Sequence, residues 1–205
     1  EIAFQTIGNI ELIVTGKANE IQDIIDKYGS TLANFPSGIT LKVTDGKELT
    51  LKSAQLDVLD SRIDGKVKIS DSTTNIGTLL DSAVSNNIKS IETTDSVLEV
   101  SFDQFRNLPK YYSANVVIKD TEKNIVDALN EDLLDDRVTT LVLTDQSNLI
   151  GNGVDDSALT LTAASASNLL GKKVQSSSDY GSNSTYMPIK IVDRASAIAN
   201  FIETA

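Results

Sequence analysis

The chain has 205 residues, of which 40% are hydrophobic and 23% are charged, as in an ordinary folded protein. Its formal net charge of −11, from 18 basic and 29 acidic residues, argues against nucleic acid as a partner, because phosphates need a basic surface. Cys, His and Trp are absent, which excludes zinc sites built on Cys or His, a Cys nucleophile and a Ser-His triad. No apolar run approaches the roughly 18 residues that a transmembrane helix needs.

The first elements in the chain are a predicted strand, a helix and two further strands. The stretch IELIVTG (10–16) predicts a strand, and Ile21, Ile24 and Ile25 form an apolar stripe at helical spacing. In ITLKVTDGKELTLKSAQ (39–55), two alternating runs flank Asp45-Gly46, a pair typical of a β-hairpin turn. We therefore expect a hairpin there, followed by a short helix that ends near Gly65.

The same succession recurs along the chain. ISDSTTNIGTLL (69–80) returns 49 residues later as IKDTEKNIVDAL (118–129). One set of aspartates opens each helical phrase, at intervals of 49 and 73 residues: Asp71, Asp120 and Asp193. A second set follows a Thr at the end of an alternating stretch, at intervals of 50 residues: Asp45, Asp95 and Asp145. Two Ser/Asn/Gly-rich insertions, 146–157 and 174–187, lengthen the third unit, and we predict both as loops. Self-similarity at such a period is typical of repeat architectures.

Each repeat is predicted to contain a strand, a helix, two strands and a short helix. We expect the Asp after the first strand to be the N-cap of the helix that follows. The helices have one apolar face each; after the first helix, its residues are Ile76, Leu79, Leu80 and Ala83, then Ile125, Ala128, Leu129 and Leu133, then Ile198, Phe201 and Ile202.

One unit cannot be stable alone. Burying some six Ile, Leu or Val side chains contributes roughly 9–18 kcal/mol, which is less than the conformational entropy lost by ordering about fifty residues. Neighbouring units must therefore stack. The predicted fold class is α/β, a repeat (solenoid-like) array of strand-helix-strand-strand units, divided into 1–70, 71–119, 120–192 and the start of a fourth unit at 193–205.

Four phrases carry a family resemblance: VVIKDTEKNIVDAL, TTLVLTDQ, SALTLTAASASNLLGKKV and PIKIVDRASAIANFI. They resemble a repeat of very large bacterial surface and secreted proteins, with the pattern V-x-D-T-A-x-N-I, L-T-D, L-T-L-T-A-x-Q and Y-x-V-x-D. Such proteins include S-layer-like proteins and type I-secreted adhesin-like proteins. The resemblance covers nearly the whole chain from about residue 10, with departures at Gly16, at Arg194 and at the two insertions. It implies an extracellular stalk or lattice segment, often dependent on Ca²⁺.

The first insertion is the best candidate for a ligand site. Asp145, Asn152, Asp155 and Asp156 would supply oxygen ligands, which Ca²⁺ prefers, and Gly151 and Gly153 permit tight turns. The stretch is similar to the glycine-and-aspartate repeats of RTX proteins, but it lacks the D-x-D-x-D-G spacing of an EF-hand. Ca²⁺ is the only cofactor we predict, and the alternative is a solvated loop.

Three further groups each have a functional and a structural interpretation. A run of carboxylates at a predicted helix end opposes the helix dipole, which indicates compensation by Arg137 or by a cation, and its structural interpretation is a solvated turn: Asp132, Asp135 and Asp136. A tyrosine pair fits either glycan stacking or the core: Tyr111 and Tyr112. Two tyrosines in the second insertion fit a lattice or partner contact: Tyr180 and Tyr186.

We therefore predict a structural, self-assembling segment of a surface-layer or adhesin-type protein at the bacterial cell surface, not an enzyme, with no catalytic residues. Its predicted partners are copies or neighbouring repeats of the same chain and cell-surface polysaccharide, with no nucleic acid and no membrane span. The alternative is a module that binds a glycan or a host protein through the third-unit loops. Because the chain starts at Glu1 without Met, we expect it to be a piece of a longer polypeptide.

Overall fold

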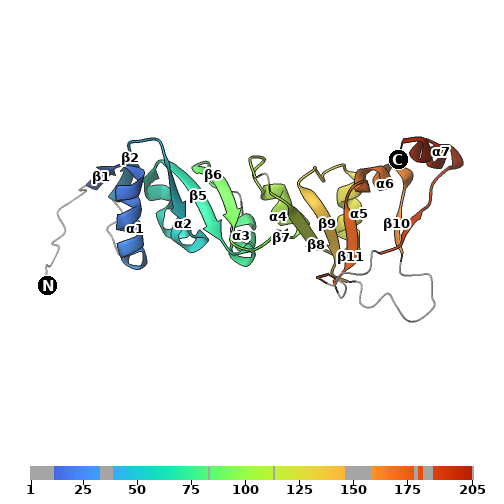
Figure 1. Ribbon diagram of the computed structural model, residues 1–205, viewed down its shortest axis with the longest axis horizontal. Coiled ribbons are helices and arrows are strands. Elements are labelled where there is room, and N and C mark those ends of the chain that lie inside the picture. Colours follow the sequence, from blue (N-terminus) through green and yellow to red (C-terminus); the bar gives the residue numbers. More distant parts are fainter. Residues whose placement is uncertain are drawn as a thin grey trace. The chain divides into compact units, whose positions relative to one another are not determined.

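The computed structural model describes residues 12–32, 39–82, 84–112, 114–145, 158–177, 180–181 and 187–204. It shows a mixed α/β protein with several small sheets, in which every pair of described strands is parallel (Figure 1). The chain divides into two compact units, Glu1–Thr94 with Pro109–Tyr112, and Asp95–Leu108 with Ser113–Ala205. The predicted α/β class is confirmed, whereas the solenoid-like array and the four-unit division stay predictions.

The first unit holds two sheets. In one sheet β1 (Leu12–Gly16) pairs with β2 (Ile39–Val43), which pairs with β4 (Ile63–Asp64), and α1 (Ala18–Leu32) joins β1 to β2. The other has the order β3 (Glu48–Leu51), β5 (Lys66–Asp71), β6 (Ile88–Thr93). The helix α2 (Ser53–Leu59) and the 3-10 turn η1 (Asp60–Arg62) lie between β3 and β4, and α3 (Thr73–Leu80) lies between β5 and β6. Helical crossovers are the connection that parallel strands require.

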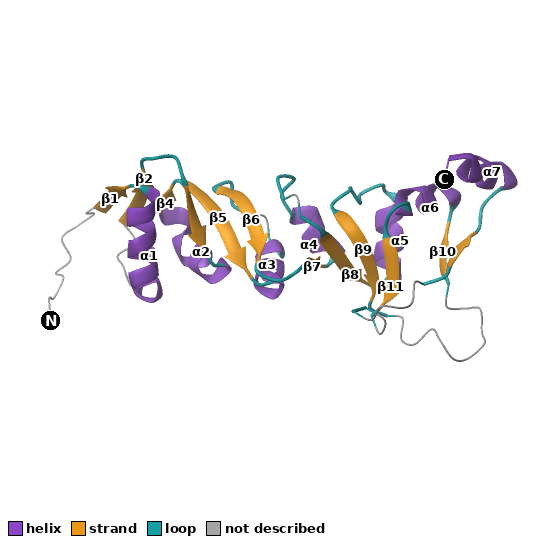
Figure 2. Cartoon of the chain, viewed as in Figure 1, coloured by secondary structure: helices purple, strands orange, loops and turns teal. Residues whose placement is uncertain are grey.

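The second unit holds a four-stranded sheet and a two-stranded sheet. The order of the four-stranded sheet is β11 (Lys173–Ser176), β9 (Val138–Leu143), β8 (Val116–Asp120), β7 (Leu98–Val100), and a separate pair joins β10 (Leu159–Leu161) to β12 (Ile189–Ile191). The helices α4 (Phe102–Asn107) and α5 (Glu122–Asn130) contact β8 and β9, as Figure 2 shows. Two more helices, α6 (Ala163–Leu169) and α7 (Ala195–Thr204), follow β10 and β12.

The core lies between the helices and the sheets, where the sequence predicted it. In β5, Val67 and Ile69 are fully buried, and the two residues between and beside them, Lys68 and Ser70, are only partly covered. The predicted helix stripes are buried in α1, α3 and α5, at Ile21 and Ile25, Ile76 and Leu80, and Ile125 and Leu129. Two predicted stripe residues are exposed: Leu133, which lies beyond the end of α5, and Ile202 in the last helix; Ala83 lies outside the described residues.

The predicted hairpin at Asp45-Gly46 is wrong. β2 and β3 lie in different sheets and each pairs in parallel with other strands. Gly46 has φ of +68°, so glycine does serve a tight turn, but this turn carries the chain from one sheet to the next. Alternation of apolar and polar residues in a sequence indicates a half-buried strand, but it does not indicate which other strand pairs with its backbone amides and carbonyls.

The second insertion is also not a loop throughout. Its first residues belong to β11, which pairs in parallel with β9 and buries Val174 and Ser176. Ser-rich composition predicted a loop, but the backbone pairing with a central strand and the burial of alternate side chains outweigh that weak local preference.

Candidate functional site

The carboxylate of Asp71 accepts hydrogen bonds from three groups. Asp71 ends β5 and is only 6% exposed. Its Oδ2 accepts the backbone amide of Ser53, the first residue of α2, at 2.9 Å. Its Oδ1 accepts the amide of Ser72 at 2.8 Å and the Nδ2 group of Asn75 at 2.9 Å. One side chain thus joins the helix that precedes β5 to the helix that follows it.

The N-cap of α3 is therefore not the residue that the sequence predicted. Ser72 takes that position, and its Oγ accepts the amide of Asn75 at 3.3 Å. Asp71 is still in the strand, so its carboxylate reaches sideways to α2 as well as forward to α3. A hydroxyl is short enough to close the first turn of its own helix, which leaves the longer carboxylate available for the neighbour.

Asp120, at the end of β8, has the same surroundings. Its Oδ2 accepts the amide of Phe102, the first residue of α4, at 2.9 Å. Its Oδ1 accepts the amide of Thr121 at 2.8 Å and Nδ2 of Asn124 at 2.7 Å, and Thr121 is the N-cap of α5. The donor on the earlier helix lies 18 residues before the aspartate in both cases. That constant interval of 18 residues was the signal in the sequence for these amide partners, which were not among the predicted contacts.

Asp193 keeps part of this set of contacts. Its Oδ2 accepts the amide of Ala163, the first residue of α6, at 3.1 Å, and its Oδ1 accepts the amide of Arg194 at 2.7 Å. Arg194 follows Asp193 as Ser72 follows Asp71 and as Thr121 follows Asp120. A guanidinium has no acceptor, so Arg194 cannot cap its own helix as the two hydroxyls do.

The Thr-Asp pairs after β2 and β9 cap the helices that join the paired strands. Asp45 Oδ1 accepts the amide of Ala18, the first residue of α1, at 3.2 Å. Asp145 accepts the amide of Glu122, the first residue of α5, at 3.0 Å (Oδ1) and 3.2 Å (Oδ2). A carboxylate at the positive end of a helix stabilises the helix.

The threonines of these pairs close the strand pairing with their backbone amides. The amide of Thr44 donates to the carbonyl of Gly16 at 2.9 Å, that of Thr94 to Asp71 at 2.8 Å and that of Thr144 to Asp120 at 2.9 Å. The Thr-Asp motif therefore has one structural role in three places: it ends the parallel ladder against the strand that precedes the helix.

The environment of Asp71 favours its charged form. Burial acts to raise the pKa of this carboxyl, but the hydrogen bonds from Asn75, Ser53 and Ser72, together with the charge of Lys52, outweigh burial and hold the pKa below its ordinary value. The donors from Ser53, Ser72 and Asn75 all bond to this carboxylate in the folded chain, and both of its oxygens accept hydrogen bonds. The carboxylate is thus arranged to hold helix ends in place.

Of the predicted calcium ligands, Asp145 is the one that the structure describes. Both of its oxygens face the amide of Glu122. Asn152, Asp155 and Asp156 lie outside the described residues. Within the described ranges no group of three or more His, Cys, Asp or Glu side chains is placed to hold a metal ion. Calcium binding at this insertion stays a prediction.

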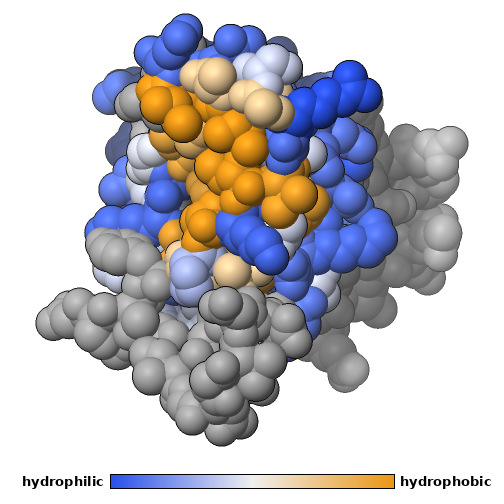
Figure 3. All heavy atoms as spheres, turned by 90° about the vertical axis from the view of Figure 1, so that its right-hand side faces the viewer, coloured by the Kyte–Doolittle hydropathy of each residue, from blue (hydrophilic) through white to orange (hydrophobic). Residues whose placement is uncertain are grey.

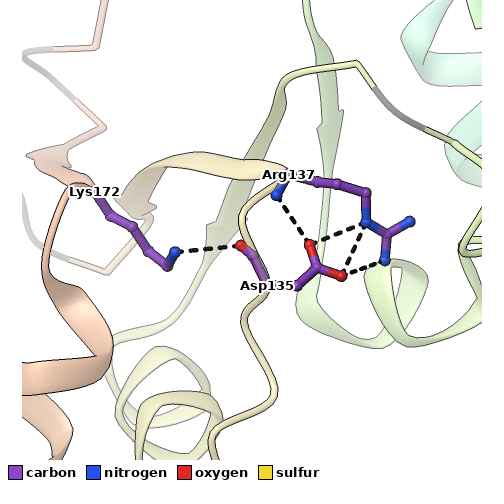
Figure 4. Close-up of polar contacts among 3 residues, drawn as sticks. All are labelled: Asp135, Arg137 and Lys172. Atoms are coloured by element: carbon purple, nitrogen blue, oxygen red, sulfur yellow. Dashed lines mark hydrogen bonds and ion pairs between the residues drawn. The ribbon is translucent and has the colours of Figure 1, made fainter.

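Of the carboxylates after α5, Asp135 pairs with Arg137, which is one of the interpretations that the sequence left open. Arg137 Nη2 lies 2.7 Å from Asp135 Oδ2, its Nε donates to both oxygens, and its own amide donates to Oδ1 at 3.0 Å (Figure 4). Hydrogen bonds from Arg137 outweigh burial and lower the pKa of Asp135. Lys172 Nζ donates to the Asp135 carbonyl at 3.2 Å. Asp132 adopts a left-handed conformation with φ of 52°, which Asp tolerates better than most residues.

The tyrosines have structural surroundings. Tyr112 is buried, and Tyr111 donates its hydroxyl hydrogen to the carbonyl of Ile88 at 2.8 Å while part of its ring stays exposed. The Nζ of Lys119 lies over the ring of Tyr180, 5.0 Å from the ring centre, in a cation–π contact. Burial, with a hydrogen bond and charge from Glu99, raises the pKa of Tyr180 to about 12. Tyr186 lies outside the described residues.

Lys119 and Glu99 were not singled out by sequence because they lie on different strands. Lys119 Nζ is 3.0 Å from Glu99 Oε2, and the two side chains come from neighbouring parallel strands, β8 and β7. No local pattern joins residues separated by a whole crossover helix.

None of the helices formed by the described residues is long and apolar enough to cross a membrane. Comparison of the chain with family models, with curated proteins and with solved structures gave no match.

Proposed function

We propose that this chain is a structural segment in which successive β-α units are laid against each other as a solenoid-like array. The observation that carries the proposal is the matching contact set of Asp71 and Asp120. Each carboxylate links the first amide of the preceding short helix to the start of the following helix. A device that links consecutive elements in chain order is what a quasi-linear array needs, because each unit is stabilised by its neighbours.

The setting we propose is the bacterial cell surface, in a large S-layer-like or adhesin-like polypeptide. This part rests on the resemblance of the recurring phrases to repeats of such proteins. We also propose that the segment self-associates or contacts neighbouring repeats, and that Ca²⁺ stabilises it. A structural function suits the described aspartates, because Asp45, Asp71, Asp120 and Asp145 all accept helix amides.

Sedimentation velocity of the purified chain tests assembly. We expect the weight-average sedimentation coefficient to rise with protein concentration in millimolar Ca²⁺ and the rise to weaken in EDTA. A chain that stays monomeric in both buffers over the whole concentration range refutes self-assembly. Loss of association only in EDTA supports the calcium prediction, and equal association in both buffers refutes it.

The alternative, a glycan- or protein-binding module, needs a more selective deletion than the whole second insertion. Residues 174–176 belong to β11 and pair with β9, so removal of 174–187 damages a sheet. Deletion of 182–186 alone leaves every described strand intact. Binding of cell-surface polysaccharide that is lost in this deletion, by a chain that does not self-associate, favours the binding module over the assembly segment.

A further inference from the structure

The last strand, β12, pairs with one described strand, as β1 does, whereas β5 and β8 each pair with two. β1, β5 and β8 each pair in parallel with the strand that follows their helix, namely β2, β6 and β9. β12 pairs with β10, and no described strand follows α7. Among the described strands, β12 is therefore paired on one edge, whereas β5 and β8 are paired on both.

The side chains at this edge are exposed where their counterparts are buried. Nine residues after Asp71 and Asp120, Leu80 and Leu129 are 0% exposed, but nine residues after Asp193, Ile202 is 70% exposed. Four residues before the same aspartates, Val67 and Val116 are 0% exposed, but Ile189 is 38% exposed. Figure 3 shows the resulting apolar patch on the face at this end of the second unit. An apolar patch of this kind marks a contact surface.

The backbone of β12 presents bonding groups along the same edge. The amide of Val192 donates to the carbonyl of Leu161, and the carbonyl of Pro188 accepts the amide of Leu159, so residues 188, 190 and 192 face β10. Because neighbouring residues of a strand point their backbone groups to opposite sides, Ile189, Ile191 and Asp193 face away from β10. In the earlier copies the corresponding carbonyls, those of Asp71 and Asp120, accept the amide of a threonine.

Among the described residues, the N-terminus of α7 has no contact with the Asp of a Thr-Asp pair, unlike the N-termini of α1 and α5. The amides of Ala18 and Glu122, the first residues of α1 and α5, each donate to the Asp of a Thr-Asp pair. Within the described residues, no carboxylate accepts the amide of Ala195, the first residue of α7. Arg194 cannot act as an acceptor, and with Lys190 it adds positive charge beside this edge. A carboxylate is the complementary group.

We propose that the free edge of β12 and the apolar face of α7 bind an extended polypeptide segment of a neighbouring unit of the same kind. The segment carries alternating apolar residues followed by Thr-Asp and pairs in parallel with β12. Its Thr amide donates to the Asp193 carbonyl, its Asp accepts the Ala195 amide, and its apolar side chains cover Ile189 and Ile202. This inference rests on the proposed array and names the contact through which the array is extended; it is a case of β-strand addition.

The test supplies such a segment at high effective concentration. The tethered chain carries a copy of residues 133–145 joined directly after Ala205. Because Ala205 lies 12 residues after Asp193, as Asp132 lies 12 residues after Asp120, the copy follows Asp193 at the same spacing as residues 133–145 follow Asp120. Because tethering raises the effective concentration of the segment, even a segment of weak affinity should occupy the edge of β12 if the inference is correct. The readout is amide hydrogen exchange by NMR in the full-length chain. We expect the amides of Ile191 and Ala195 to exchange at least about tenfold more slowly than in the chain without the tethered copy. The amide of Val192, which is already bonded to β10, serves as the internal reference.

Three matched variants make the result specific. A tethered copy with a scrambled order removes the alternation and should give no protection. A tethered copy carrying the Asp145→Ala change, which removes the acceptor, should protect Ile191 while leaving Ala195 in fast exchange. The substitution Ile202→Asp, on an exposed position that should leave the fold of the unmodified chain intact, should abolish protection by the native copy.

Equal exchange with the native and scrambled copies overturns the inference. Protection of Ile191 and Ala195 that grows with the concentration of the unmodified chain and is lost in Ile202→Asp means that a second copy supplies the segment, which supports the inference. Sedimentation of the unmodified chain keeps this result apart from the proposed function: assembly that persists in Ile202→Asp supports a structural role whatever the exchange experiment shows.

Discussion

Replacement of Asp71 by Asn tests whether a strand-end carboxylate holds two helices in place. Asn keeps an oxygen for the amide of Ser72 and for Asn75, but its NH2 group then faces the amide of Ser53, to which Asp71 Oδ2 is now bonded at 2.9 Å. Leaving that buried donor unpaired costs about 1–3 kcal/mol, and loss of the charge at two helix N-termini costs about 0.3–1 kcal/mol for each. The expected loss is about 2–5 kcal/mol in the free energy of unfolding.

The assay is urea unfolding followed by circular dichroism, with Asp64→Asn as the control. Asp64 lies 3.5 Å from Lys42 in an exposed ion pair, for which we expect about 0–1 kcal/mol. Equal losses in the two variants refute the capping argument.

The pH dependence gives a second check on Asp71. Because folding lowers the pKa of this carboxyl below 3.8, its contribution is present above the unfolded-state pKa and is lost as the pH falls through the folded-state value. The difference between the wild-type chain and Asp71→Asn should therefore be constant from neutral pH to about pH 5 and should shrink in stronger acid. A difference that instead grows on acidification contradicts the assigned sign.

Three other predictions follow from burial and from the carboxylate contacts. Leu129→Ala, at a fully buried position, should cost about 2–5 kcal/mol, whereas Ile202→Ala, on the exposed end of α7, should change the stability of the isolated chain by less than about 0.5 kcal/mol; urea unfolding measures both. Ultraviolet titration of tyrosinate should show Tyr180 ionising near pH 12; Glu99→Gln should lower that pKa, and stability should fall as the pH rises from 10 towards 12, because a raised folded-state pKa contributes below the unfolded value. Asp145→Asn should lower the melting temperature in EDTA as well as in Ca²⁺, because the carboxylate accepts the amide of Glu122 without any metal.

Each of these has an opposing outcome. Similar losses for Leu129→Ala and Ile202→Ala would mean that the end of α7 is covered in solution. A titration in which every tyrosine ionises near pH 10 refutes the contact between Tyr180 and Glu99. An effect of Asp145→Asn that appears only in Ca²⁺ assigns this carboxylate to the metal instead of the helix.

The sequence predicted the elements well because their signals are local. Alternation in 66–71 and helical spacing at Ile76 and Leu80 depend on residues within one or two turns of each other, and both elements and their buried faces are present. The aspartates were also recognised as helix-capping residues. The prediction assigned Asp71 as the N-cap of the helix that follows it. In the structure its Oδ2 accepts the first amide of the helix before its strand, 18 residues back, and Ser72 is the N-cap of the helix after it.

The partner of each strand was decided only by the tertiary structure. Asp45-Gly46 forms a real turn, yet the strands on its two sides belong to different sheets. A strand's own residues show that one face is buried, but its backbone groups can be satisfied by any strand of suitable length and register. The choice of parallel neighbours depends on how the intervening helices pack, which involves residues twenty or more positions away.

By itself, then, the sequence determined where helices and strands form, which of their faces are apolar and where aspartates recur, because those properties arise from neighbouring residues. Only the tertiary structure decided that the strands pair in parallel, that Asp71 and Asp120 each bridge two helices, and that Arg137 pairs with Asp135. The physical reason is that a hydrogen bond or an ion pair depends on distance in space, and distances between residues separated by a crossover exist only after the helices have packed.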